Sequence, residues 1–174
     1  MKSLSDYIKD AVTATSTIER PVYFLFGNWM ELCNDLGDKA QSPTYRNQRY
    51  PLVLMHNEYK ENREIGWNKV KVDELKLYII CQSEIVGSKT NPENYSTEQR
   101  KESIYKLILN PIYESLIIEM KKGSNFQKNV WDLLHDRKDL YRLYVGDKQN
   151  RLPDHLDAIE LSFKNLVYKI KKYS

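Results

Sequence analysis

Three histidines are the side chains of this sequence best suited to acid–base or metal chemistry. His56, His135 and His155 lie far apart, and none has a second ligand at helical or strand spacing. Asp154 and Asp157 flank His155, and a carboxylate beside an imidazole resembles an acid–base pair. Because no nucleophile accompanies them, a small hydrolase that uses His155 and Asp157 is the least favoured of three functional hypotheses.

The glycines, cysteines and clustered aspartates do not indicate a further site. All six glycines stand alone, so the sequence has no phosphate-binding loop of the GxGxxG or GxxxxGKS type. Cys33 and Cys81 lack CxxC spacing, which fits synthesis in a reducing compartment. Asp132, Asp136 and Asp139 would share a helix face, but the basic residues between them favour a solvated surface. We therefore expect no catalytic residue, no metal and no cofactor.

Length and charge predict one soluble domain, 1–174, without a nucleic-acid-binding surface. The net charge of +3 comes from 27 basic and 24 acidic residues spread along the chain. No stretch approaches the roughly 20 apolar residues of a membrane span, and the N-terminus has no apolar signal segment. Thirteen tyrosines and three tryptophans suit contact surfaces, although tyrosines also line ordinary strands.

The longest regular pattern runs from Ser96 to Gly123 and predicts an amphipathic helix. Ser96 and Gln99 have capping-box spacing, and Gly123 is expected to end the helix. Pro111 removes a backbone donor and crowds the preceding turn, which predicts a kink near 107–110. The expected buried face comprises Ile104, Leu107, Ile108, Ile112, Leu116 and Met120. The expected solvent face comprises Arg100, Lys101, Lys106, Glu114 and Lys122.

Shorter patterns predict the elements around this helix. They are a helix at 3–18, a strand at 22–26, a helix capped by Asn28 and ended by Gly37, and strands at 51–57, about 70–82, 140–145 and 158–170. Strands 51–57 and 70–82 are expected to pair antiparallel, with the last strand beside 70–82. The apolar positions of this last strand change parity near Lys164 and Asn165, which predicts a bulge.

Together these elements predict an α+β fold: a small, mostly antiparallel sheet with the N-terminal helix and one long Pro-kinked helix packed on it. Odd-numbered residues from Leu75 to Cys81 form the core face of their strand, and Lys76 and Tyr78 point away. Two long polar loops, at about 38–49 and 83–95, connect the elements and are candidates for contacts.

Four segments carry a family resemblance, which covers residues 19–170. They are PVYFLFGNWMELCNDLGDKAQSPTYRNQRYPLVLMHNEYKE, the strand at 70–81, the helix containing ILNPIYESLI, and LPDHLDAIELSF near the C-terminus. Their order resembles the small neck and tail proteins of tailed bacteriophages that infect Bacteroidetes, including crAss-like phages. The resemblance implies a tail-terminator-like or tail-completion and connector protein: a structural virion component, made in the host bacterial cytoplasm, without enzyme activity.

The resemblance also implies partners. These are copies of the same chain, in a six- or twelve-fold ring, and neighbouring portal, connector or tail proteins; DNA would pass through the lumen without specific binding. Because tyrosine and arginine are enriched in interfaces, the expected contact residues are Tyr45, Arg46, Arg49, Tyr50 and Tyr95. Two alternatives stay open: the loops are plain connections, and the protein is an intracellular adaptor or regulatory protein-binding domain without enzyme activity.

Overall fold

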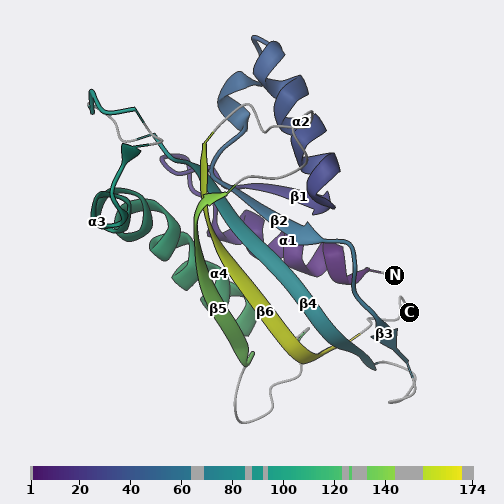
Figure 1. Ribbon diagram of the computed structural model, residues 1–174. Helices are drawn as coiled ribbons and strands as arrows, with labels where there is room; N and C mark the ends of the chain where they lie inside the picture. Colours follow the sequence, from purple (N-terminus) through teal and green to yellow (C-terminus); the bar gives the residue numbers. More distant parts are fainter. Residues whose placement is uncertain are drawn as a thin grey trace.

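The computed structural model describes residues 2–63, 69–84, 88–91, 94–122, 126, 133–143 and 155–169. Its centre is a six-stranded sheet in the order β1-β2-β4-β6-β5, with β3 also paired to β4 (Figure 1). The strands are β1 (Tyr23–Gly27), β2 (Leu52–His56), β3 (Glu61–Asn62), β4 (Lys69–Gln82), β5 (His135–Leu143) and β6 (Leu156–Lys169). The helices are α1 (Leu4–Thr15), α2 (Trp29–Gln41), the 3-10 turn η1 (Arg46–Gln48), and one long helix made of α3 (Thr97–Arg100), η3 (Lys101–Leu109) and α4 (Asn110–Lys122).

The sheet is mostly antiparallel, as predicted. Among the described strands, only β1 and β2 run parallel, and the β2–β4, β3–β4, β4–β6 and β5–β6 pairs are antiparallel. The predicted neighbours of the 70–82 strand are therefore confirmed on both of its sides. The strand expected at 140–145 begins earlier, at His135.

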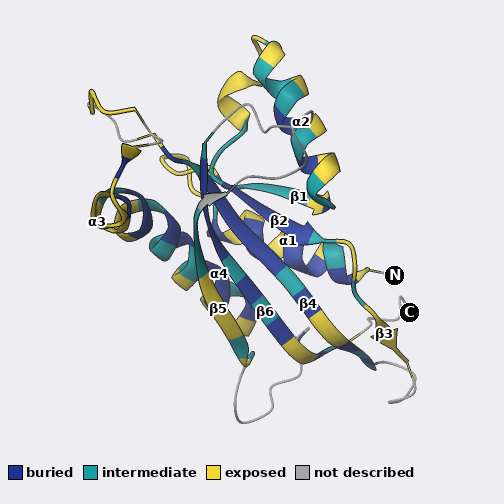
Figure 2. Cartoon of the chain, in the orientation of Figure 1, coloured by how far each residue is buried: buried dark blue, intermediate teal, exposed yellow. Residues whose placement is uncertain are grey.

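Helices cover both faces of the sheet, and the sheet separates the apolar core into two clusters. The larger cluster lies under α1 and the long helix, and the smaller one lies under α2 (Figure 2). Odd-numbered residues from Leu75 to Cys81 face the larger cluster, as predicted. Tyr78 points the other way but is only 6% exposed, because α2 packs there and the Trp29 ring lies 4.6 Å from the Tyr78 ring. Both faces of β4 are thus buried from Leu77 to Cys81.

The parity change in β6 is real, but the predicted bulge is wrong. Buried positions shift between Phe163 and Leu166, and β4 shifts at the same level. The register stays constant through this point, with Glu74 still opposite Lys164. Asn165 takes a left-handed φ of 55°. In both strands the side that faces the core therefore changes near Asn165, and neither strand has an inserted residue.

The helix after β1 begins where the sequence predicts and ends later. The Asn28 side chain accepts hydrogen bonds from the N–H groups of Met30 and Glu31, at 2.9 and 3.0 Å. The predicted stop at Gly37 is wrong, because α2 continues to Gln41. A salt bridge of 2.7 Å between Lys39 and Asp35 supports its last turn. The first predicted loop therefore begins four residues late and contains η1.

The long helix begins with the predicted capping box. Ser96 Oγ accepts from the Gln99 N–H at 3.2 Å, and Gln99 Oε1 accepts from the Ser96 N–H at 2.9 Å. Its middle, η3, is π-helical and ends immediately before α4, whose first turn contains Pro111. The wider π turn changes which side chains face the sheet, so the prediction that Leu107 is buried is wrong; this side chain is 62% exposed. A kink of the helix axis at Pro111 stays a prediction.

The remaining predictions concern the termini and the second loop. Helix α1 buries the side that its pattern predicts, although it ends at Thr15. Within 83–95, the described residues around 88–91 are exposed and project from the body of the protein (Figure 1). The expected helix stop at Gly123 lies outside the described residues. Among those described, no helix is long and apolar enough to cross a membrane.

Candidate functional site

Four of the five predicted contact residues lie around η1, between α2 and β2. Tyr45 is 52% exposed and Arg46 is exposed, whereas Arg49 and Tyr50 are half-buried. Arg49 Nε donates to the Arg46 carbonyl at 3.1 Å, and its guanidinium lies 5.7 Å from the centre of the Tyr50 ring. Tyr50 also packs against the smaller core cluster. Tyr45 and Arg46 are thus the members of this group that face solvent most fully.

The fifth predicted residue, Tyr95, is buried. It is 1% exposed, its ring centre lies 5.7 Å from the guanidinium carbon of Arg100, and its carbonyl accepts from Arg100 Nε at 3.3 Å. Because Tyr95 packs inside the chain, it presents no surface to a partner, contrary to the expectation from the sequence. Because the predicted loop is mostly polar, its composition did not indicate that the Tyr95 ring is buried.

Arg100 forms a buried ion pair that the sequence did not predict. Its Nη1 lies 2.6 Å from Asp157 Oδ2, and the two side chains are 1% and 0% exposed. Ser83 Oγ donates to the same oxygen at 2.6 Å. These contacts join the first turn of the long helix to β6 and to the end of β4. The placement of Arg100 on the solvent face was therefore wrong: the first turn of the helix lies against the sheet.

The ion pair also bears on the hydrolase hypothesis. Asp157 is bound by Arg100 and Ser83 away from solvent, and the Ser83 N–H donates to the His155 carbonyl at 2.7 Å. Burial raises the pKa of the neighbouring Cys81 thiol well above its usual value, and the Asp157 charge adds to this effect. A thiol that keeps its proton is a poor nucleophile. The contacts among Arg100, Asp157 and Ser83 therefore join the long helix to β6 and to the end of β4.

Tyr105 makes a second buried tie between the long helix and the sheet. Its hydroxyl donates to the Leu140 carbonyl at 2.7 Å and to the Ala158 carbonyl at 3.0 Å. Burial, followed by the Asp157 charge, raises the pKa of the Tyr105 phenol. A phenol that stays protonated keeps donating to both strands.

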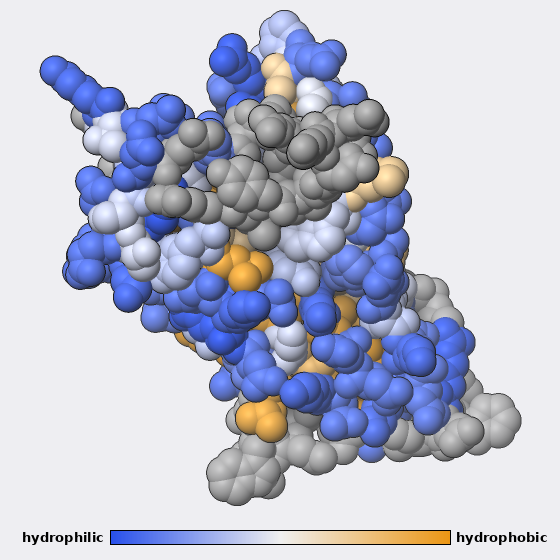
Figure 3. Space-filling model, in the orientation of Figure 1, coloured by the Kyte–Doolittle hydropathy of each residue, from blue (hydrophilic) through white to orange (hydrophobic). Residues whose placement is uncertain are grey.

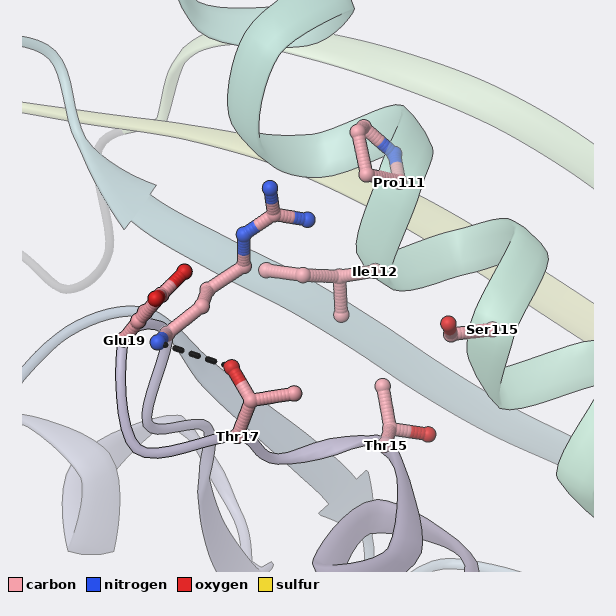
Figure 4. A pocket seen from close by; sticks show the side chains of 7 residues that line it. Thr15, Thr17, Glu19, Pro111, Ile112 and Ser115 are labelled. Atoms are coloured by element: carbon pink, nitrogen blue, oxygen red, sulfur yellow. Dashed lines mark hydrogen bonds between the residues drawn. The ribbon is translucent and has the colours of Figure 1, made fainter.

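A polar cavity of about 440 Å³ opens between the turn after α1 and the start of α4 (Figure 4). Its walls are formed by Thr15, Thr17, Glu19, Arg20, Pro111, Ile112 and Ser115. The Arg20 N–H donates to Thr17 Oγ1 at 2.9 Å, which fixes the turn. The lining combines hydroxyls, one acid, one base and aliphatic groups. This mixture suits water or a polar side chain and indicates no particular ligand.

A second hollow and the histidines do not indicate a metal site. The hollow, of about 520 Å³, is lined by Glu58, Tyr59, Lys60, Asp73 and Glu74. Across the described ranges, no group of three histidine, cysteine or acidic side chains is placed to hold a metal ion. Both ring nitrogens of His135 have partners, the Tyr113 hydroxyl at 3.0 Å and the Leu133 carbonyl at 2.7 Å. The two cysteines form no disulfide.

Exposed apolar side chains occur on several separate elements. The large ones are Ile18, Phe26, Met30, Tyr45, Leu107, Ile118 and Leu134. Leu107 and Ile118 both lie on the long helix, where they are 62% and 50% exposed. The face seen in Figure 3 is mainly hydrophilic, with small apolar patches. These side chains are candidates for contacts with other proteins.

No family model matches this chain, and no curated protein matches it. The order of the sequence segments and the geometry of the exposed surfaces are therefore the features that indicate a function.

Proposed function

We propose that this protein is a structural subunit of a ring in the neck or tail of a tailed bacteriophage. In this role it joins the portal or head connector to the tail, as a tail-terminator or tail-completion protein does, and it carries no enzyme activity. The ring contains six or twelve copies, and DNA passes through the lumen without specific binding. The observation that carries the proposal is the presence of exposed apolar side chains on two different elements, η1 with its flanks and the long helix.

The long helix supplies the first contact surface. Its inner side buries Ile112 and Leu116, while Leu107 and Ile118 remain exposed on other sides. Full burial of an aliphatic side chain of this size contributes about 1.5–3 kcal/mol. A neighbour that covers both side chains gains this contribution twice, and a closed ring strengthens each contact by holding every subunit on both sides.

The second contact surface lies around η1. The Tyr45 ring is exposed there, and the next residue in the sequence, Arg46, is exposed as well. Tyrosine and arginine, together with tryptophan, are the residue types most enriched among the side chains that dominate binding energies. A ring requires head-to-tail contacts, in which one surface of a subunit binds a different surface of the next. The η1 and long-helix surfaces differ in composition and position, which is what such a contact needs.

The fold and charge agree with this role. Helices packed on a mostly antiparallel sheet are expected of tail-terminator-like proteins, and a kink at Pro111 is part of that proposal. The net charge of +3 is low for a chain of this length, so a lumen built from it would not trap DNA.

The mass of the purified protein, alone and with its candidate portal partner, tests the proposal. Native mass spectrometry should find a closed multimer of the 20.7 kDa chain, either alone or on the partner. Tyr45→Asp and Leu107→Asp should each prevent closure, because each damages one of the two surfaces. An equal mixture of the two variants should form a species larger than either variant forms alone, since each variant keeps the surface that the other has lost.

The control is Ile18→Asp, which changes an exposed side chain outside both surfaces and should leave the multimer intact. A wild-type chain that stays monomeric and ignores the portal would contradict the ring and favour the adaptor hypothesis. A mixture that forms no species larger than the separate variants do would show that the contact is not head-to-tail.

A further inference from the structure

Strand β1 forms one edge of the sheet, and no described strand pairs with its outer side. The Tyr23 N–H donates to the Pro51 carbonyl at 3.0 Å, and the Gly27 carbonyl accepts from the Asn57 N–H at 3.2 Å. Odd-numbered residues of β1 therefore direct their backbone groups toward β2. Because backbone groups alternate sides along a strand, Phe24 and Phe26 direct their N–H and C=O groups away from the sheet.

The open edge has a defined length. On its N-terminal side, the Val22 N–H donates to Ser16 Oγ at 2.9 Å. On its C-terminal side, the Asn28 N–H donates to Glu31 Oε2 at 2.7 Å. Between these two capped positions, the outward N–H and C=O groups of Phe24 and Phe26 have no hydrogen-bond partner among the described residues. The edge thus offers two donors and two acceptors in strand geometry.

The chemistry of this edge is unusual for this protein. No charged residue occurs from Val22 to Met30, and Phe26 is 43% exposed. Exposed edges are usually protected by charges, prolines or covering segments, since an unprotected edge pairs with other strands. The opposite edge, β5, carries four consecutive charged residues, from Asp136 to Asp139. We therefore expect an uncharged strand, and not the β5 strand of another copy, to pair with the β1 edge.

We propose that β1 pairs antiparallel with β1 of a second copy of this chain, across a two-fold axis at Leu25. In this register Phe24 lies opposite Phe26 of the partner subunit, and the outward groups of both residues form a doubly hydrogen-bonded pair. The symmetry repeats the pair, so all four outward groups of each copy are used. The phenylalanine rings lie opposite one another on a single face, an arrangement that stabilises antiparallel pairs.

The choice of a second copy follows from charge and symmetry. Among the described strands at the ends of the sheet, β1 is the uncharged one, so the matching edge in another copy is β1 itself. A two-fold contact is self-complementary, whereas ring contacts are head-to-tail. This contact therefore goes beyond the proposed ring: together the two contacts build two rings facing each other, with twice the number of subunits.

Phe26→Pro tests the pairing, with Phe26→Ala as the matched control. Both variants lose the phenyl ring of Phe26. Only the proline variant also loses the outward N–H, which β1 does not use within its own sheet. Removing this donor from both copies deletes two of the four hydrogen bonds. Sedimentation at a series of concentrations should show that Phe26→Pro self-associates about 30-fold more weakly than Phe26→Ala. Circular dichroism checks that both variants keep their fold.

Amide hydrogen exchange of the unaltered protein gives a second readout. The amides of Phe24 and Phe26 should exchange fast in dilute solution and slow down as the concentration rises, while the Leu25 amide stays protected throughout. Equal self-association of the two variants, or rates at Phe24 and Phe26 that ignore concentration, would overturn the pairing. Leu107→Asp separates this contact from the ring: it should stop ring closure and leave the two-fold dimer.

Discussion

The two edges of the sheet are held in different ways. At the β5 edge, side chains of the long helix bind the sheet through polar groups: the Tyr105 hydroxyl binds the Leu140 carbonyl, and Arg137 donates to Asn110 Oδ1 at 2.6 Å. One strand further in, Asp157 on β6 binds Arg100. At the β1 edge, α1 and α2 pack apolar side chains against both faces, and no other described strand pairs with the backbone edge.

This difference separates the part of the sheet that maintains the fold from the part that can accept a partner. Buried polar groups are costly to disturb, because each loses its partner in a place that water does not reach. Apolar packing on the faces of a strand leaves the hydrogen-bonding direction of that strand unused. The β5 edge of the sheet should therefore control stability, and the β1 edge should control the two-fold pairing.

The largest expected effect is on the β5 side, from Asp157→Ala. The substitution leaves the Arg100 guanidinium buried without its carboxylate and also removes the acceptor of Ser83. Breaking a buried ion pair in this way costs about 3–5 kcal/mol. Urea unfolding followed by circular dichroism should show this loss, and it should show little change for Lys106→Ala, which removes an exposed ion pair of the same helix.

A double variant sharpens this result. Arg100→Met with Asp157→Leu replaces both charges by apolar groups, so no buried charge is left alone. It should recover most of the stability that Asp157→Ala loses. If the double variant is as unstable as the single one, then the ion pair itself, and not the unpaired Arg100, determines the loss.

The next prediction compares proline substitutions at two adjacent positions of β1. Leu25→Pro removes an inward N–H and a side chain packed against the smaller core cluster, which should cost about 2–4 kcal/mol. Phe26→Pro removes an outward N–H and a ring contact with Tyr59, which should cost about 1 kcal/mol. The same unfolding measurement checks both values. Equal losses would mean that the outer side of β1 also contributes to the fold.

Local sequence patterns predicted most of the β1 side and the central strand β4. The alternation in 70–82, the start of α2 at Asn28 and the strand at 22–26 each follow from nearest-neighbour chemistry: which residues are apolar, which side chains cap a helix, and which residues favour strands. The end of α2 was missed, because Gly37 tolerates a helix and Leu36 is buried inside it. A glycine is a weaker signal than the burial of its neighbour.

The β5 side was harder to predict, because its contacts join residues far apart in the sequence. Arg100 and Asp157 are 57 positions apart, and nothing in the local pattern around either residue marks it as buried. The predicted burial of Leu107 was wrong for another reason. The prediction assumed α-helical spacing, and a π-helical turn changes this spacing. Pairings of distant polar groups and changes of helical period are properties of the assembled fold.

A smaller effect is expected from Tyr105→Phe, again on the β5 side. The ring stays in the core, but the carbonyls of Leu140 and Ala158 lose a shared donor. Loss of a buried hydrogen bond of this kind should cost about 1–2 kcal/mol. Amide exchange should become faster along β5 and stay unchanged along β1. A uniform increase across the sheet would show that the two edges do not behave as separate regions.

The smallest effect at neutral pH concerns Tyr78, which lies under α2. Burial, aided by the Glu160 carboxylate, raises the pKa of Tyr78 to about 12 from a usual value of 10.0. Between these values the unfolded chain releases the phenolic proton and the folded chain keeps it, so the free energy of unfolding falls as the pH rises. Below pH 10 this contribution is fully present.

Unfolding free energies measured from about pH 9 to about pH 11 should therefore fall less steeply for Tyr78→Phe than for the unaltered protein. Tyr45→Phe is the control, since it removes a phenol that is 52% exposed. Equal slopes for all three proteins would show that Tyr78 reaches solvent under α2. In that case α2 would not seal this face of the sheet, and the apolar packing that leaves the β1 edge free for a partner would be weaker than the structure indicates.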